Sequence, residues 1–357
     1  MTGNVGSFAF AQIAPTVNLS SYAARFVELD HCIMRMGQAR RSAMLITKGK
    51  AHFQNLAILR EKVFLHSDSR SRNPVGQVLR LGNKVIVRTG SDLQNHGRGI
   101  VVGGPSHNWF HWLIEQLPTI HRALTESYDW ASWPLVLRRE VLERENFVKT
   151  LRLVAPESTV VPVDAEAFFR LDRALILEAP TSPGTVDFGL FGNFLKRNHF
   201  DLAIMSPYRS KLREYAVNLP RTSHPKRIFL TRSRGRNRPY NQSELIDIAK
   251  KFGFKPMNPD EHSLENLWSA LAHASVVAGP QGAAWANSIV CPQGAIGIQW
   301  NGGSLRGESF QSLASLVGMT MHHLVGEGGF DDGYRIDPKE FERTLVVALQ
   351  GTSKGRG

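Results

Sequence analysis

Cysteine is scarce in this chain of 357 residues: Cys32 and Cys291 are the only two, and they lie far apart. This scarcity argues against a disulfide framework and a cysteine-based zinc site, and it favours a reducing compartment. No stretch approaches the roughly 18 apolar residues that span a bilayer. The amino terminus has neither the basic segment nor the apolar run of a signal peptide. We therefore expect a soluble cytoplasmic protein, at most peripheral to the inner face of the membrane.

The common nucleotide-binding signatures are also missing. The chain contains no G-x-G-x-x-G and no G-x-x-x-x-G-K-[ST], so neither a dinucleotide fingerprint nor a P-loop is supported. No internal repeat is present, and low complexity is confined to residues 351–357, which we expect to be frayed.

Basic side chains exceed acidic ones. The chain has 43 Lys and Arg against 31 Asp and Glu, a formal net charge of +12. Such an excess indicates anionic partners, which can be nucleic acid, a lipid surface or phosphorylated small molecules. The alternative is that the charge only keeps a basic protein in solution.

The first part of the chain predicts one domain over residues 1–217. Residues 1–40 look irregular, and short apolar runs between turns over residues 43–102 predict mainly antiparallel strands. Residues 106–217 read as α/β, with strands within 134–139, 158–163 and 174–179. Helices are predicted from His107, over 140–153, and in a long segment ending near Val217. The proline-containing segment 218–226 is the predicted linker.

The second part, residues 227–334, alternates short apolar strands with amphipathic helices. This rhythm predicts βαβ units and a parallel sheet covered on both faces, so the fold class is α/β. Ligands bind such sheets beyond the carboxyl ends of the strands. A last helix within 335–350 is a candidate to pack back on the first domain.

Two loops at these strand ends carry the features of an anion site. In the segment Gly279–Asn287 a strand leads through two glycines into a helix, whose first amides, near Gly282 and Ala283, attract anions. The segment Thr231–Asn241 holds four arginines; Arg232 is the preferred phosphate ligand and Arg234 the second, and the others are taken as surface charges. Together the loops would fit a diphosphate. The alternatives are a tight turn without a ligand and a solvated basic loop.

The segment His107–Ile120 carries the candidate acid–base chemistry. With Ser106 as the helix cap, His107, His111 and Glu115 fall on one stripe, and Pro118 should kink or restart the helix. A carboxylate one turn from an imidazole can orient it and raise its basicity. Two alternatives stay open: histidines that ligate a metal, for which no third ligand is evident, and histidines that are simply buried and hydrogen-bonded.

Four motifs in order resemble glycosyltransferase family 61, inverting enzymes of capsule biosynthesis and of eukaryotic protein and wall glycosylation. The resemblance covers roughly residues 100–325 and points to the bacterial capsular-polysaccharide branch. Its motifs are Asn108-x-x-His111-x-x-x-Glu115-x-x-Pro118, Thr231-Arg232, Glu261-His-Ser263-Leu-Glu265-Asn266, and Val277-x-Gly279-Pro280-Gln281-Gly282-Ala283-x-x-x-Asn287.

The resemblance implies a GT-B architecture, in which two Rossmann-like domains face each other across a cleft. The carboxyl-terminal domain would hold a nucleotide-diphosphate sugar, and the amino-terminal domain a glycan or lipid-linked acceptor. The chain has no D-x-D metal motif, so we expect no metal or other cofactor. Arg232, Arg234 and the helix dipole at Gly282 would then supply the positive charge.

The family's functional positions map onto this chain residue by residue. His111 would take the acceptor proton and Glu115 would orient it; the closest variant makes Glu115 the base. The substrate-binding and donor-binding positions would be Asn108, His107, Arg232, Arg234, Glu261, Pro280, Gln281, Gly282, Ala283, Asn287 and Gln299.

Two positions depart from the family pattern. Gln281 stands where the glycine loop usually has histidine, and Gln299 where the next strand commonly ends in an acidic residue. These departures favour, as an alternative, a non-catalytic nucleotide-sugar or carbohydrate-binding relative. The net charge raises nucleic-acid binding as a further alternative, but no RNP-like or helix-turn-helix signature accompanies it. The expected partners are a nucleotide sugar, a glycan or lipid-linked acceptor and, through the basic surface, an anionic membrane.

Overall fold

A computed structural model gives the fold in two compact units, Ser20–Tyr208 and Met1–Leu19 together with Arg209–Gly357. We call them the amino-terminal and carboxyl-terminal units. The division falls inside helix α5 (Leu202–Asn218), whereas the sequence-based boundary follows residue 217. The structure describes residues 12–13, 23–36, 44–48, 50–53, 56–60, 62–66, 78–81, 84–88, 93–103, 108–125, 132–165, 167–181, 200–220, 225–233, 238–302, 308–329 and 333–353.

The main sheet of the amino-terminal unit is mixed. Its strand order is β12-β11-β10-β13-β2-β3-β4-β5, with β9 beside β13. The strands are β2 (Phe26–Arg35), β3 (Met44–Thr47), β4 (Lys50–Phe53), β5 (Leu56–Arg60), β9 (Gln94–Asn95), β10 (Arg98–Val101), β11 (Leu135–Arg138), β12 (Val160–Val163) and β13 (Phe168–Leu177). Strands β2 to β5 pair antiparallel, as predicted for residues 43–102, but β10 runs parallel to both β11 and β13. A second sheet pairs β8 (Lys84–Arg88) with β6 (Lys62–His66) in parallel and with β7 (Val78–Leu81) antiparallel.

Strand β2 corrects the prediction that residues 1–40 are irregular. Nine of its ten residues, all except His31, pair antiparallel with β13. His31 has a φ of 47°, a left-handed conformation that interrupts the alternation of a strand. The buried and half-buried residues before His31 have odd numbers, and the buried residues after it do not continue that alternation. A search for apolar residues at every second position therefore does not detect this strand.

The helices of the amino-terminal unit contain a wide turn. A short helix α1 (Trp109–His111) continues into a π-helix, η1 (Trp112–Gln116), and then into α2 (Leu117–Thr125). Helix α2 begins at Leu117, one residue before Pro118. This agrees with the prediction that the helix is kinked or restarted at this proline. The predicted helix over 140–153 is two helices, α3 (Arg139–Leu142) and α4 (Glu145–Val154).

The sheet of the carboxyl-terminal unit contains the predicted parallel strands. Its order is β1-β18-β17-β16-β14-β15, and the strands from β15 to β18 all run parallel. The strands are β14 (Arg227–Leu230), β15 (Lys255–Met257), β16 (Val276–Pro280), β17 (Ile296–Gly302) and β18 (Thr320–Gly329). Two short strands, β1 (Gln12–Ile13) and β19 (Gly333–Arg335), add to β18 antiparallel. Residues near the amino terminus thus complete the carboxyl-terminal sheet, contrary to their predicted place in the first domain.

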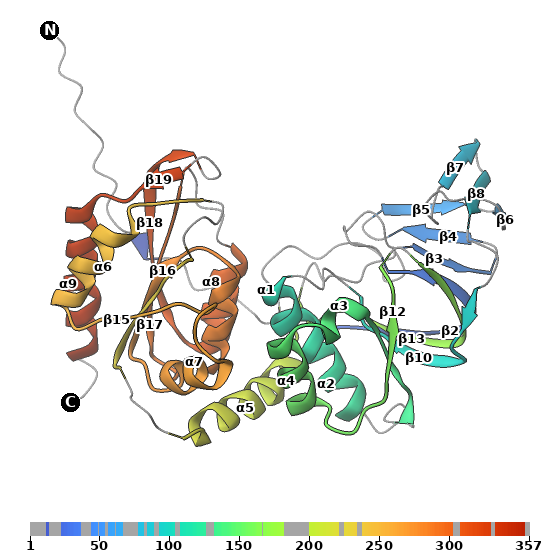
Figure 1. Cartoon of the computed structure of the whole chain (residues 1–357), viewed down its shortest axis with the longest axis horizontal. Helices are drawn as coiled ribbons and strands as arrows, with labels where there is room; N and C mark the ends of the chain where they lie inside the picture. The colour runs from blue at the N-terminus through green and yellow to red at the C-terminus, as the bar shows by residue number, and fades with distance from the viewer. Residues whose placement is uncertain are drawn as a thin grey trace, which may run out of the picture. The chain divides into compact units, whose positions relative to one another are not determined.

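Helices cover both faces of this sheet (Figure 1). Helices α6 (Gln242–Lys251) and α9 (Pro338–Ser353) lie side by side on one face. On the other face lie α7 (Leu264–Leu271), the 3₁₀-helix η3 (Ala283–Val290) and α8 (Glu308–Val317). Helix α9 was a candidate to pack on the first domain; instead Phe341, Leu345 and Ala348 lie in the core of its own unit. It extends to Ser353, and residues 354–357 of the predicted frayed tail lie outside the described part.

The strand order contains a reversal of the kind at which α/β proteins bind ligands. The chain passes from β14 to β15 on one side and then returns to the other side of β14 to form β16. In open α/β sheets, ligands bind at the carboxyl ends of the strands at such a reversal. The loops after β14 and β16 are those that carry Arg232 and Gly282.

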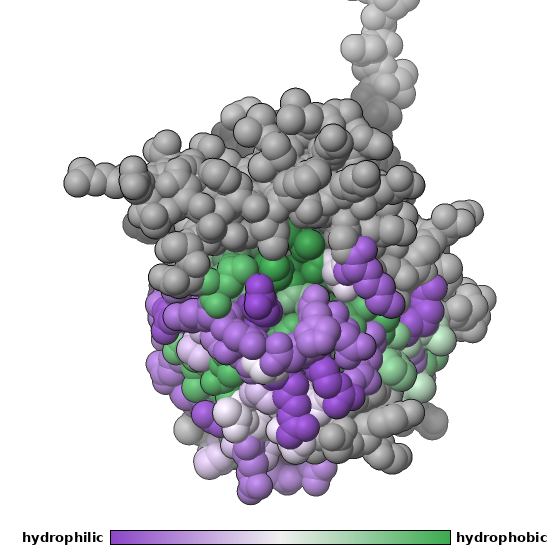
Figure 2. All heavy atoms as spheres, turned by 90° about the vertical axis from the view of Figure 1, so that its right-hand side faces the viewer, coloured by the Kyte–Doolittle hydropathy of each residue, from purple (hydrophilic) through white to green (hydrophobic). Residues whose placement is uncertain are grey.

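Hydrophilic and hydrophobic side chains are interspersed on the face of the amino-terminal unit shown in Figure 2. Several exposed arginines of this unit pair with carboxylates: Arg25 with Glu178, Arg139 with Asp164, and Arg173 with Glu28. In these pairs the positive charge of each arginine is balanced locally by a carboxylate. Among the described helices, none is both long and apolar enough to cross a bilayer.

The packing of α9 can be tested by stability. Phe341 is fully buried and its ring contacts those of Phe229 and Trp300. Phe341→Ala should lower the free energy of unfolding by about 3–5 kcal/mol, because it leaves a cavity. Val347→Ala, on an exposed position of the same helix, is the control and should cost under about 0.5 kcal/mol. Equal urea-denaturation midpoints for the two variants would contradict this packing.

Candidate active site

Asn108 caps the helix that carries the candidate base. Its backbone is extended, and its Oδ1 accepts hydrogen bonds from the amides of Phe110, at 2.9 Å, and His111, at 3.4 Å. The helix therefore begins at Trp109 rather than at His107, and the cap is Asn108 rather than Ser106. Ser106 and His107 lie outside the described residues. The side-chain oxygen of Asn108, a predicted substrate ligand, is already engaged by the helix.

His111 and Glu115 form a hydrogen-bonded pair, with 2.8 Å between Nδ1 and Oε2. Because a carboxylate only accepts, Nδ1 donates, and Nε2 of the neutral ring keeps its lone pair. The His111 side chain is 16% exposed and that of Glu115 is 7% exposed. The pair is thus a carboxylate-oriented imidazole that reaches the surface, which is the arrangement of a general base.

Aromatic packing holds this helix in place. Phe147 of α4 stacks on Trp112 and contacts Trp109, each at 5.2 Å between ring centroids. The indole N–H of Trp112 donates to Thr150 Oγ1 at 2.9 Å. Leu113 and Leu117 are fully buried, as predicted, whereas Trp109 is only half-buried.

Arg232 follows β14 and is held from both ends. Its backbone pairs with the Gln242 carboxamide: the Arg232 amide donates to Oε1 at 2.8 Å, and Nε2 donates to the Arg232 carbonyl at 3.0 Å. Its guanidinium donates to the carbonyls of Arg238 and Gln281. These contacts fix the Arg232 guanidinium beside the loop that follows β16. Arg234 lies outside the described residues.

Gly282 is adjacent to this guanidinium. A Cβ at Gly282 would lie 3.1 Å from Nη2 of Arg232. The φ of Gly282 is 173°, an extended value open to any residue, so the glycine is explained by the approach of Arg232 and not by a left-handed turn. Gly282, Ala283 and Ala284 are half-buried, and the first amides of a helix have no acceptor within it. The helix is 3₁₀ rather than the expected α.

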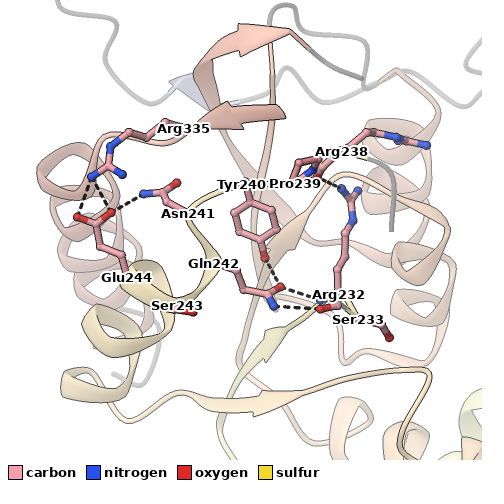
Figure 3. Close-up of a pocket in the computed structure, with 10 residues that line it drawn as sticks. All are labelled: Arg232, Ser233, Arg238, Pro239, Tyr240, Asn241, Gln242, Ser243, Glu244 and Arg335. Carbon is pink, nitrogen blue, oxygen red and sulfur yellow. Dashed lines mark hydrogen bonds and ion pairs between the residues drawn. The ribbon is translucent and has the colours of Figure 1, made fainter. Parts of the chain in front are cut away.

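A pocket of about 450 Å³ lies beside Arg232 (Figure 3). It is lined by the segment from Arg238 to Glu244, by Arg232 and Ser233, and by Arg335, which pairs with Glu244 at 2.7 Å. Tyr240 stacks on Tyr334 with 5.7 Å between ring centroids, and burial raises the pKa of both phenols. Both phenols stay neutral near pH 7. The charged side chains that line the pocket are therefore those of Arg232, Arg238, Arg335 and Glu244.

Polar contacts join the loops after β14 and β15. Asn258 donates to Ser233 Oγ at 3.2 Å and to Glu261 Oε1 at 2.6 Å. Ser233 in turn donates to Asp260 at 2.9 Å. One oxygen of Glu261, a predicted donor ligand, is therefore used to hold the turn after β15.

Three further residues predicted to bind the nucleotide sugar, Pro280, Gln281 and Asn287, are buried. Gln281 is buried, and its Oε1 accepts from Asn301 at 2.7 Å. Pro280 is buried at the end of β16. Asn287 accepts from Trp268 at 2.8 Å and donates to the Ala284 carbonyl at 2.9 Å, so its carboxamide stabilises the core and η3. We therefore leave Asn287 out of the binding site proposed below.

Gln299, at a departure from the family pattern, is 1% exposed, and its Nε2 has no partner in the described part of the chain. His323 lies opposite it on β18, and its Nε2 also lacks a partner there. Burial and the neighbouring His322 lower the pKa of His323 to about 4.

Sequence reasoning missed Gln242 and Tyr240, which fix Arg232 from the start of α6, because ordinary polar residues before a helix carry no signal of such pairing. It also took Arg238 as a surface charge. The φ of Arg238 is 71°, and this left-handed conformation accompanies a carbonyl contact with the Arg232 guanidinium.

The protein is thus an α/β protein with a carboxylate-oriented imidazole on one unit and a cation beside helix amides on the other. A protein-family model described as Glycosyltransferase 61 matches residues 109–298, more than half of the chain. The chain therefore belongs to glycosyltransferase family 61 and is a glycosyltransferase that uses a sugar donor and a glycan acceptor. A search of curated proteins found no match. Within the described ranges, no cluster of three or more His, Cys, Asp or Glu side chains is arranged for a metal ion.

The buried His323 predicts a pH-dependent stability. Its pKa is lowered by burial from 6.5 to about 4, so the unfolded chain binds a proton between these values that the folded chain does not. Stability should fall as the pH drops through this window, by up to about 1.4 kcal/mol per pH unit from this residue. His323→Gln should flatten the slope by about that amount, as measured by urea unfolding at pH 4.5, 5.5 and 7. Parallel slopes for the two proteins would contradict the burial of a neutral imidazole.

Proposed function

We propose that this chain is an inverting, metal-independent glycosyltransferase that moves a sugar from a nucleoside-diphosphate donor to a hydroxyl of a glycan or lipid-linked acceptor. The observation that carries the proposal is the His111–Glu115 pair in a family 61 chain, in which Glu115 bonds to Nδ1 of a partly exposed imidazole. A role in surface-polysaccharide synthesis, a cytoplasmic location and peripheral membrane contact belong to the proposal.

The reaction needs one base and one displacement. His111 Nε2 accepts the proton of the acceptor hydroxyl, and the Glu115 carboxylate stabilises the imidazolium that forms. The acceptor oxygen attacks the anomeric carbon as the bond to the diphosphate oxygen breaks on the opposite face. A single displacement inverts the anomeric configuration.

The leaving diphosphate gains negative charge that the protein must stabilise. Arg232 lies against Gln281 and Gly282, so its charge and the first amides of η3 act at one place. Positive charge supplied in this way supports transfer without a metal ion. The neighbouring pocket of about 450 Å³ has the size of ordinary small-molecule sites, roughly 300–1,000 Å³.

The proposal divides the substrates as GT-B enzymes do. The carboxyl-terminal unit would bind the nucleotide sugar at the carboxyl ends of β14 and β16, and the amino-terminal unit would bind the acceptor. Gln281 and Gln299 would affect the choice of donor, since both lie on the loop and strand next to this edge.

Removing the base should greatly slow sugar transfer without removing donor binding. We expect His111→Gln to lower kcat by about 10²–10⁴-fold, the usual contribution of a general base. Glu115→Gln, which keeps the shape but loses the charge, should have a smaller effect. Released nucleoside diphosphate is measured with a panel of nucleotide sugars, and donor binding by thermal shift. Near-normal turnover by His111→Gln would dismiss the assignment, and donor binding without any release by the wild type would favour a binding-only relative.

Arg232 should matter for the diphosphate in particular. Loss of a charged hydrogen bond costs about 1.5–3 kcal/mol, so Arg232→Ala should weaken nucleoside-diphosphate binding by roughly 10–150-fold. Arg139→Ala removes an exposed charge of the other unit and is the matched control. Calorimetry is run with and without chelator, and chelator should change neither affinity nor turnover. Equal affinities for the two variants, or loss of turnover in chelator, would contradict this part of the proposal.

A further inference from the structure

The turn that carries Glu115 is wider than an α-helical turn. In η1 the backbone bonds span five residues: the Leu117 amide donates to the Trp112 carbonyl. Such turns are rare inside helices and occur frequently at functional sites. Here the wide turn begins directly after His111 and includes Glu115, so it sets where the carboxylate lies relative to the imidazole.

Pro118 leaves one carbonyl of this turn without a helical donor. In the five-residue register, the Leu113 carbonyl would accept from the amide of residue 118. Proline has no N–H, and the amide of Leu117, the α-helical alternative, is already bonded to Trp112. Leu113 is fully buried, so water does not replace the missing donor.

Tyr208 of α5 supplies that donor. Its phenolic O–H donates to the Leu113 carbonyl at 2.7 Å, and the side chain is fully buried. Burial raises the pKa of the phenol well above its ordinary value, so the O–H stays protonated whenever the protein is folded. The Tyr208 ring also contacts the edge of His121 on α2, at 5.8 Å between centroids.

We propose that Tyr208 is a positioning residue for catalysis: its bond to the Leu113 carbonyl, together with Pro118, holds the wide turn that places Glu115 on His111 Nδ1. This inference rests on the proposed role of the His111–Glu115 pair. Tyr208 reaches no substrate; it acts through the backbone of η1. Without the phenolic oxygen, the α-helical register competes with the wide turn; in that register Glu115 stays one turn from His111 but is rotated about the helix axis relative to the imidazole.

The test is Tyr208→Phe, which removes one oxygen and keeps the ring. The proposal expects kcat to fall at least tenfold with the donor KM within twofold of wild type. Thr150→Val is the control: it removes an equally buried bond to the same turn, made to the Trp112 indole and not to its backbone. It should lower the melting temperature by a similar amount and keep kcat within about twofold.

A second readout does not depend on turnover. Proton and nitrogen NMR of histidine-labelled protein detects the hydrogen-bonded Nδ1 proton of His111 as a downfield signal. The signal should be present in the wild type and in Thr150→Val, and lost or strongly shifted in Tyr208→Phe. If the wild type shows the signal but transfers no sugar from any donor, the proposed function fails while this inference is still tested.

Pro118→Ala completes the test. The substitution restores an N–H. Because the Tyr208 hydroxyl already occupies the Leu113 carbonyl, this N–H should bond to the Ile114 carbonyl in an α-helical register, and the variant should lose kcat and the Nδ1 signal as Tyr208→Phe does. Because both changes act on one turn, the double variant should be no worse than the more impaired single variant. Losses in kcat that multiply in the double variant, or an unchanged Nδ1 signal in a folded Tyr208→Phe protein, would overturn the inference.

Discussion

The bond between His111 Nδ1 and Glu115 is the contact on which the proposed chemistry depends. It fixes the tautomer of the neutral imidazole, because the carboxylate can only accept, and it leaves the lone pair on Nε2 of a partly exposed ring. Two features of the local backbone accompany this bond: the residue at which the helix starts and the width of the turn that follows. Asn108 determines the start, and the π-helical register that follows determines the width.

The carboxyl-terminal unit meets a different constraint. The approach of Arg232 to Gln281 and Gly282 requires that the strands preceding them be neighbours, and the reversal of strand order between β14 and β16 makes them so. The Gln242 carboxamide then bonds to the backbone amide and carbonyl of Arg232, the groups that a residue of a neighbouring strand would otherwise pair with. A cation that is fixed before the ligand arrives costs little reorganisation when charge develops on the leaving group.

The positions that differ from the family pattern are not all equivalent. Gln281 is hydrogen-bonded to Asn301, whereas Gln299 is buried with an amide nitrogen that has no partner in the described part of the chain. It lies opposite His323, a histidine that burial keeps neutral near pH 7. A neutral pair of this kind avoids the cost of a buried charge under the sheet edge.

The sequence by itself determined the alternating elements of residues 227–334, the parallel sheet and the spacing of His111 from Glu115, because these follow from local periodicity and from turn residues. It also indicated Arg232 and Gly282 as neighbours, since the ends of parallel strands meet at one edge. Only the tertiary structure decided that β2 is a strand and that β1 joins the carboxyl-terminal sheet. Only it decided that α9 packs on its own unit, that Asn287 is a core residue, and that Tyr208 replaces the donor missing at Pro118. Each of these depends on a partner from far along the chain, and the pattern of one segment contains no information about the partner that completes its hydrogen bonds.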